Sequence, residues 1–249
     1  MPIQITWYDN AAFKLETESG ILWFDPSVNK NPDSPIRVED VKESAKFVFT
    51  THGDGGHFAN SVEMTLKTGA KFVGSEDLCD SVLKGGKLAE DKIISLKFGE
   101  AKTIDGIEVY LFEAEHPELV SSPEKEEMRR KWGRLQTRNG GFVVKGKNFS
   151  LCLVGDCVYS NVFREIGRRF KIDIGMIPIQ AFKKSSPIEE AVESGAQIVR
   201  DLKVKVLFPV IQYTTEKDCL EALKRRLKEM GVTTRLLFDR PGIVHTLGD

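Results

Sequence analysis

The stretch at residues 50–58, TTHGDGGHF, contains residue types that proteins commonly use to bind transition metals. His52 and His57 carry imidazole rings, and Asp54 between them carries a carboxylate. Imidazole and carboxylate are usual ligands of zinc, and also of iron, manganese and nickel. The stretch follows the apolar run KFVF, so we expect a loop at the end of a buried strand. The pattern therefore predicts a metal-binding loop, in which three glycines give the backbone freedom for a tight path.

Three more polar residues follow apolar runs in the same way. His116 comes after VYLFEAE, Asp156 after SLCLVG, and Gln212 after KVLFPVI. Loops at one edge of a packed scaffold are where binding sites are usually assembled. We expect these side chains to meet the loop that carries His52 and Asp54.

Strands and helices that alternate along the chain must position these loops. Residues 3–28 read as three short strands of an antiparallel meander. Residues 37–46 contain a short helix that leads into a strand at 47–50. Ser75 is expected to cap a helix, because two acidic residues follow it. Residues 92–116 read as a strand, a turn and a second strand.

No linker or low-complexity segment divides the chain, so residues 1–249 are predicted to form a single domain of two similar halves. We expect two mixed sheets packed together, with helices outside them. Residues 117–138 are polar, charged and weakly patterned. A loop of that length inside a compact domain is usually functional or partly disordered.

Composition limits the classes of function. The 249 residues carry a formal net charge of −1, so no overall field attracts nucleic acid or an anionic membrane. No apolar stretch is long enough to span a bilayer, and the first residues lack the pattern of a signal peptide. We therefore expect a cytoplasmic protein. Its four cysteines are too few and too scattered for a disulfide framework, so we expect buried or ordinary reduced thiols.

The order and spacing of these residues resemble the metallo-β-lactamase superfamily over nearly the whole chain. The loop of that family reads Thr-His-x-His-x-Asp-His, and residues 51–57 here read THGDGGH. His116 matches the next family ligand at a strand end. Gly155-Asp156 matches the family's Gly-Asp pair, whose carboxylate bridges two metals. The resemblance implies an α/β (α+β) fold, a four-layer αββα sandwich.

A closer resemblance is to the branch that contains L-ascorbate-6-phosphate lactonase and many metal-dependent hydrolases. The N-terminal strands with the turn Asp25-Pro26 are similar to that branch, and so is the strand at 173–180. The helix at 186–202, which precedes the last ligand strand, is also similar. This branch implies hydrolysis of a small, anionic ester, lactone or phosphate-bearing compound by a metal-activated water.

The chain departs from the family at several ligand positions. Asp54 stands at the second histidine of the loop, and Gly56 stands at its aspartate. Gln212 stands at the final histidine, and Asp9-Asn10 replaces the Gly-His pair of the closer branch. A glycine has no side chain with which to bind a metal.

The departures fall unevenly on the two metal positions that the resemblance implies. One metal would take His52, Asp54, His116 and Asp156, so its four positions keep ligand-type side chains. The other would keep only His57 and Asp156, with Gln212 as a weak neutral candidate. Gln212 is otherwise part of the wall of the site, where it could contact substrate, or an ordinary strand end. Losing ligands weakens a site strongly. We therefore expect one divalent metal, zinc before manganese, iron or nickel, and a second bound weakly or not at all.

The resemblance also implies catalytic roles. Gly56 cannot orient the attacking water as the family's aspartate does, so Asp54, if it is not a ligand, or Asp9 is a candidate base. His57 is a ligand or a proton-transfer partner. The basic run RRKWGR, which ends at Arg134, is a solvated segment or a lid whose arginines meet an anionic substrate.

Each of these residues also has an ordinary structural interpretation. Asp54 and Asp156 could be turn residues. Asp25 precedes a proline and is a turn former, or at most supports the ligands from behind. His245 matches no ligand position, so we expect it to be structural or exposed to solvent.

We expect an enzyme, a metal-dependent hydrolase with a small-molecule substrate. The main alternative is a non-catalytic protein of the same fold that binds a small molecule or a protein partner, and the altered ligands favour it. The nuclease branch of the fold is disfavoured by the near-neutral charge and by the lack of an appended RNA-binding segment. Assembly into a homo-oligomer is left open.

Overall fold

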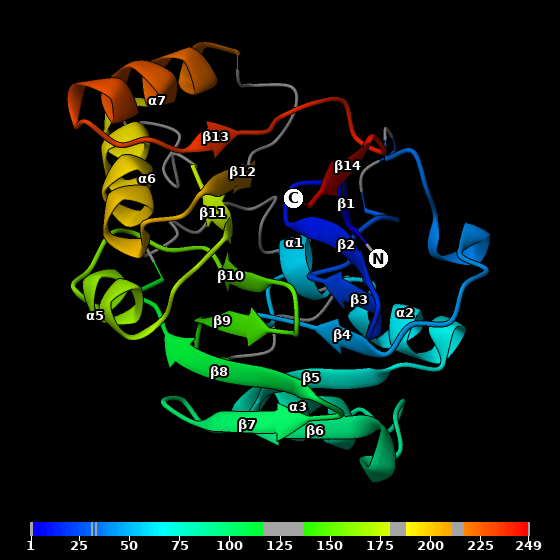
Figure 1. The fold of residues 1–249 in the computed structure, drawn as a ribbon. Helices are drawn as coiled ribbons and strands as arrows, with labels where there is room; N and C mark the ends of the chain where they lie inside the picture. The colour runs from blue at the N-terminus through cyan, green and yellow to red at the C-terminus, as the bar shows by residue number, and fades with distance from the viewer. Residues whose placement is uncertain are drawn as a thin grey trace, which may run out of the picture. The chain divides into compact units, whose positions relative to one another are not determined.

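The computed structural model describes residues 2–30, 32, 34–116, 137–179, 188–210 and 217–248. They fall into two compact units (Figure 1). Unit 1 comprises residues 1–102, 121–138 and 240–249, and unit 2 comprises residues 103–120 and 139–239. No helix among the described residues is long and apolar enough to cross a bilayer.

Unit 1 is built on a mixed sheet in which seven strands are described, in the order β14-β1-β2-β3-β4-β5-β6 (Figure 1). The strands are β1 (Ile3–Asp9), β2 (Ala12–Thr17), β3 (Gly20–Phe24), β4 (Phe47–Phe49), β5 (Lys71–Ser75), β6 (Ile93–Leu96) and β14 (Val244–Leu247). Strands β1 to β3 pair antiparallel, which confirms the predicted meander, and β3 to β6 pair parallel. The short helix α1 (Gly55–Phe58) is followed by α2 (Ser61–Thr68) and α3 (Glu76–Lys84).

Unit 2 has a sheet of the same design, also with seven described strands, in the order β13-β12-β11-β10-β9-β8-β7. The strands are β7 (Ala101–Ile104), β8 (Ile107–Glu113), β9 (Gly140–Lys145), β10 (Ser150–Val154), β11 (Ile174–Pro178), β12 (Val206–Val210) and β13 (Arg235–Leu236). Strands β8, β9 and β10 pair antiparallel, whereas β10 to β13 pair parallel. The two predicted mixed sheets with helices are therefore confirmed.

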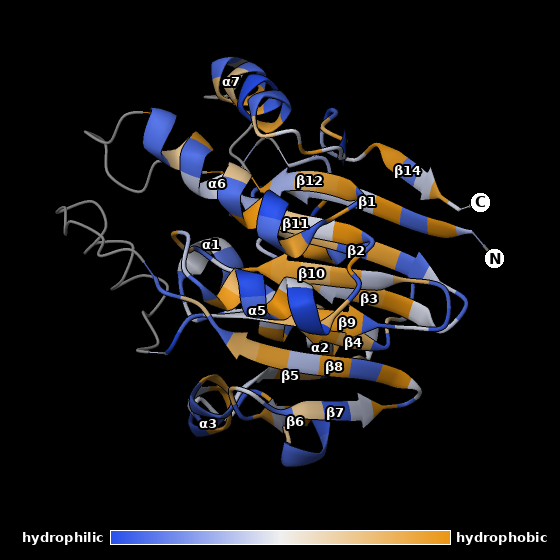
Figure 2. Cartoon of the chain, turned by 60° about the vertical axis from the view of Figure 1, so that its left-hand side comes forward, coloured by the Kyte–Doolittle hydropathy of each residue, from blue (hydrophilic) through white to orange (hydrophobic). Residues whose placement is uncertain are grey.

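The described helices of unit 2 are amphipathic and cover buried strands. They are α5 (Val162–Arg169), α6 (Ile188–Leu202) and α7 (Lys217–Glu229). In α6, Val192, Ala196 and Val199 lie three to four residues apart and are buried in one core, as a helical period requires. Figure 2 shows this alternation of hydrophilic and hydrophobic bands along α6. Strands β10 and β11 are buried along their whole length.

Strand direction decides where the candidate ligands emerge. In unit 1, β3 and β4 are parallel neighbours with Phe24 opposite Phe49, so the residues that follow both strands leave the sheet at the same edge. In unit 2, β8 and β10 flank β9 and both run antiparallel to it, so they too end at one edge. This is the arrangement on which sites in open α/β sheets are built.

Several predicted elements differ from the structure. The helix expected within 37–46 is only a 3-10 turn at Val38–Asp40, because the backbone of the next residue, Val41, is extended. Residues 92–116 hold three strands rather than two, because turns at Gly99 and Gly106, both with positive φ, break the run. Strand β14 was not predicted.

Two local predictions about helix starts are also wrong. Ser75 occupies the N-cap position of α3, but its side chain makes no capping hydrogen bond. The glycines of the loop are not used for unusual backbone angles, because Gly55 and Gly56 begin α1 rather than a tight irregular turn.

Candidate metal centre

The fully buried carboxylate of Asp25 organises the loop after β4 in unit 1. Because β3 and β4 are in register, the N–H of Asp25 donates to the carbonyl of Phe49 at 2.9 Å. The backbone N–H and the hydroxyl of Thr51 donate to Oδ1 and Oδ2 of Asp25, both at 2.8 Å. Asp25 has a φ of +43°, a backbone conformation that aspartate and asparagine tolerate better than most residues. The turn after β3 thus fixes the first residues of the histidine loop.

The same carboxylate orients His57. Its Nδ1 lies 2.7 Å from Oδ2 of Asp25, and both side chains are buried. A carboxylate can only accept, so Nδ1 of His57 carries the proton. Nε2 of His57, a buried atom, then carries the ring's lone pair. This pairing of a carboxylate with the far nitrogen of a histidine is typical of metal ligands.

His52 is oriented through Thr51. The Thr51 hydroxyl donates its proton to Asp25, so at its 3.0 Å contact with Nδ1 of His52 it can only accept. His52 is therefore also assigned the tautomer in which Nδ1 carries the proton and the buried Nε2 carries the lone pair. The two imidazole rings lie side by side, with 4.2 Å between their centroids.

Helix α1 gives the loop its second half. Asp54 is the N-cap of α1 and its carbonyl accepts the N–H groups of His57 and Phe58, both at 2.9 Å. Its side chain makes no capping hydrogen bond, so the capping role expected of a turn aspartate falls to its backbone. The carbonyl of Gly56 accepts the Ser27 hydroxyl at 2.7 Å, which ties α1 to the turn after β3.

In unit 2, Asn139 connects the segments that carry His116 and Asp156. It lies directly before β9, which separates β8 from β10. Its side-chain amide donates to the carbonyl of Ala114 at 3.2 Å and to the carbonyl of Asp156 at 2.7 Å. Burial, followed by the charge of Asp156, raises the pKa of the neighbouring Cys157 thiol well above its usual value. That thiol therefore stays protonated near neutral pH.

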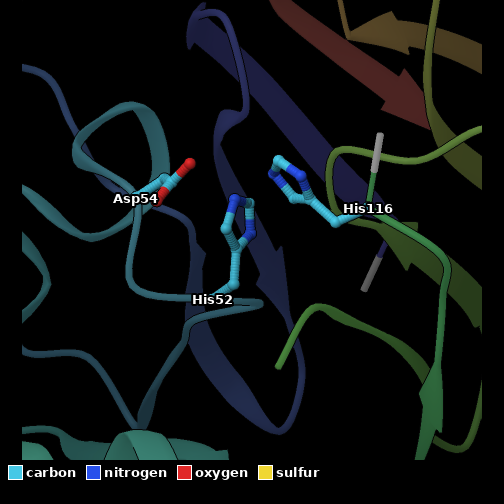
Figure 3. Close-up of side chains that lie close together, drawn as sticks. All are labelled: His52, Asp54 and His116. Atoms are coloured by element: carbon cyan, nitrogen blue, oxygen red, sulfur yellow. The ribbon is translucent and has the colours of Figure 1, made fainter. Parts of the chain in front are cut away.

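Ligand-type atoms of His52, Asp54 and His116 lie within 4.8 Å of one another (Figure 3). Ligand-type atoms of His52, His57 and Asp156 form a second group, and they too lie within 4.8 Å of one another. All five residues predicted as metal ligands thus belong to one of two groups that share His52. Two or three imidazoles with carboxylates form a donor set that suits zinc and other borderline divalent metals, so the residues present fit the predicted ion.

The other predicted residues have different outcomes. Gln212 and Arg134, the substrate candidates, lie outside the described residues, as does most of the segment 117–138. Asp9 ends β1, and His245 lies in β14 opposite Ile5, away from the histidine loop in sequence.

The residue whose part sequence reasoning underestimated is Asp25. It is predicted to be a turn former, or at most to support the ligands from behind, and it makes hydrogen bonds with both sides of the histidine loop. The signal that points to it is its place directly after a buried strand, one strand away from the strand that leads into the loop.

A pocket of about 600 Å³ lies in unit 1 and is lined by residues of α2 and α3. Its lining includes the apolar side chains of Phe58, Val62 and Leu66 and the basic side chain of Lys87. None of the predicted ligands lines it. Its size therefore says nothing about the chemistry of the histidine loop.

The comparison with known protein families decides the classification. Residues 4–211 match the model described as "Beta-lactamase superfamily domain". The chain belongs to this superfamily. The match includes β1, the histidine loop, His116 and Asp156, and it confirms the predicted fold, two mixed sheets and helices of the metallo-β-lactamase type.

Individual relatives extend over almost the whole length of this superfamily member. It is 28% identical over 231 residues to a UPF0173 metal-dependent hydrolase of Pyrobaculum islandicum, covering 90% of this chain and 94% of that protein. It is 27% identical over 244 residues to a UPF0173 metal-dependent hydrolase of Methanopyrus kandleri, covering 96% of this chain and 98% of that protein.

Among solved structures, Igni18, a metallo hydrolase from Ignicoccus hospitalis, aligns with a TM-score of 0.77 at 19% identity, covering all of both chains. An isothiocyanate hydrolase from Delia radicum gut bacteria aligns with a TM-score of 0.66 at 18% identity, covering 97% of this chain and 98% of that one. At these identities, the structures support the fold alone.

Proposed function

We propose that this chain is a metal-dependent hydrolase acting on a small, anionic ester, lactone or phosphate-bearing substrate. The observation that carries the proposal is the pair of three-residue groups that share His52, in a chain of this superfamily. Relatives that cover nearly the same length are named metal-dependent hydrolases, which supports the reaction class. The lactonase-like substrate class rests on the resemblance of the turn Asp25-Pro26 and of the stretch 173–180, which contains β11.

We assign the principal metal to His52, Asp54 and His116, with Asp156, which groups with His52 and His57, as its fourth ligand. A bound divalent metal supplies an activated water and polarises a carbonyl or phosphoryl oxygen. The residues around the metal position orient the side chains that would bind it. Asp25 and Thr51 hold the two loop histidines in the tautomer that turns Nε2 into the acceptor nitrogen.

His57 has a different role in this proposal. Gly56 removes the carboxylate that the family uses beside it, so the second metal position keeps few ligands. Because its Nδ1 is held by Asp25, His57 can exchange a proton only through Nε2. We therefore assign His57 to proton transfer or to a weak second ion, and Asp54 to the metal or to the base.

Elemental analysis of protein purified without added metal tests the proposal. We expect about one equivalent of a divalent metal, a stoichiometry that four retained ligand positions predict. His52→Ala and His116→Ala should lose it, and Asp54→Asn should weaken it. His245→Ala is the matched control, because it removes the fourth histidine of the chain from β14 and should keep the metal.

Activity is measured on a panel of aryl esters, lactones, phosphomonoesters and phosphodiesters, with zinc, manganese, iron or nickel added in turn. Hydrolysis that follows metal content across the variants supports the proposal. A wild-type protein that binds none of these metals and hydrolyses nothing would overturn it. Metal binding without hydrolysis of any member of the panel would favour the non-catalytic alternative instead.

A further inference from the structure

A hydroxyl that is distant in sequence contacts the backbone of the histidine loop between two of its proposed ligands. The N–H of Gly53 donates to Oγ1 of Thr137 at 2.8 Å, across 84 positions of sequence. Gly53 joins His52 to Asp54, so this contact acts on the peptide that sets the spacing of their side chains. Both partners of this hydrogen bond belong to unit 1.

Thr137 is itself held in place by the residue that follows it. The N–H of Arg138 donates to Oδ2 of Asp77, in the first turn of α3, at 2.6 Å. The Arg138 guanidinium lies over the ring of Phe98, 4.2 Å from its centroid, which is a cation–π geometry. Two contacts to different parts of unit 1 therefore fix the backbone from which the Thr137 hydroxyl reaches Gly53.

The loop needs such a contact at Gly53. Asp25 and Thr51 fix its beginning, and α1 fixes its end from Gly55 onward. Glycine has the widest backbone freedom of any residue, so ordering its backbone costs conformational entropy. Without the hydrogen bond from Gly53, that cost would fall on metal binding, because the ion would have to order the His52–Asp54 peptide itself.

We propose that Thr137 is a positioning residue for the metal centre: its hydroxyl holds the Gly53 amide and so pre-orders His52 relative to Asp54. The inference rests on the proposed metal site. It assigns a role to a residue at the end of the segment 117–138, which the sequence marked only as a polar loop. Thr137 acts through the loop backbone and is not itself a ligand.

The test compares Thr137→Val, which keeps the shape but removes the hydroxyl, with Thr137→Ser, which keeps the hydroxyl. We expect Thr137→Val to weaken zinc binding about tenfold, in the range seen for residues that orient ligands, and Thr137→Ser to restore most of it. Zinc affinity is measured by competition with a chromophoric chelator. Thr233→Val, a change at an exposed threonine, is the matched control and should bind zinc as the wild type does.

A second measurement is made on metal-free protein. The Gly53 amide should exchange with solvent more slowly in the wild type and Thr137→Ser than in Thr137→Val, because only the first two keep its acceptor. Equal zinc affinity in Thr137→Val and wild type, or equal losses in both variants, would overturn the inference. If the wild type binds no zinc, the proposed function fails, and the exchange comparison still decides whether Thr137 holds the loop.

Discussion

Oδ2 of Asp25 lies 2.7 Å from Nδ1 of His57, and both side chains are buried. The same oxygen accepts the hydroxyl of Thr51, whose oxygen contacts Nδ1 of His52. One carboxylate thus sets the tautomer of both histidines in the loop. It can do so because β3 and β4 are parallel and in register, so Asp25 and Thr51 emerge side by side.

Replacing Asp25 with asparagine should weaken metal binding by about 10- to 100-fold, since an amide cannot accept from every donor around it. The substitution leaves a buried hydrogen-bond donor without an acceptor, so the free energy of unfolding should also fall by about 1–3 kcal/mol. Asparagine tolerates the positive φ at this position, so the backbone is not the cause. Chelator competition and urea unfolding measure the two effects. Asp91→Asn, at an exposed site, is the control, and an Asp25→Asn protein with wild-type metal affinity would refute the assigned role.

Gly56→Asp should restore a ligand to the weak second metal position. A Cβ at Gly56 would meet only Nδ2 of Asn10 at 3.2 Å, the end of a flexible side chain, so the loop can accept it. Under saturating zinc, the metal-to-protein ratio should rise from about one toward about two. Gly55→Asp is the control, because its nearest neighbour would be Nζ of Lys30 at 3.7 Å and its position is not that of a family ligand. An unchanged ratio in a folded Gly56→Asp protein would contradict the proposal that Gly56 weakens the second metal position.

Gly167→Ala should destabilise the protein, although alanine is the better helix former by about 1 kcal/mol. Gly167 lies in α5, and a Cβ there would overlap the backbone carbonyl oxygen of Asp201 in α6. Overpacking of this kind costs about 1–3 kcal/mol or more. Urea unfolding measures the change. Gly55→Ala, whose Cβ would meet only Nζ of Lys30 at 3.7 Å, an ordinary contact distance, is the matched control. A stabilised Gly167→Ala protein would show that α5 and α6 do not approach so closely.

The cysteines should be unreactive in the folded protein. Burial raises the pKa of Cys79 to about 12, and it also raises the pKa values of Cys152 and Cys157. A chromogenic disulfide reagent should therefore label none of them at pH 8 until denaturant is added. The folded pKa of Cys79 lies above its unfolded value of about 8.5, so its contribution to stability is complete below that pH and declines as the pH rises toward 12. Rapid labelling without denaturant would contradict this.

Much of the fold can be predicted from the sequence alone. Alternation of polar and apolar residues marked the meander at β1 to β3, and the helix expected at 186–202 corresponds to α6. The pattern of the meander repeats over several residues, so a local stretch of sequence suffices to predict it. Single helical turns are harder to predict from sequence. Those at Val38–Asp40 and Gly55–Phe58 depend on one or two hydrogen bonds that no periodicity of residues reveals.

The sequence by itself determined which side chains the site has to offer. It marked His52, Asp54, His57, His116 and Asp156 as candidates, because their types and their places after apolar runs are properties of the chain. It also showed that Gly56 cannot bind a metal.

Only the tertiary structure decided what orients those side chains. The partners of the loop are Asp25, which lies 32 positions before His57, and Thr137, which lies 84 positions after Gly53. Hydrogen bonds across such separations depend on strand register and on the direction of parallel strands. Those features are set by the packing of whole sheets and not by any local pattern of residues.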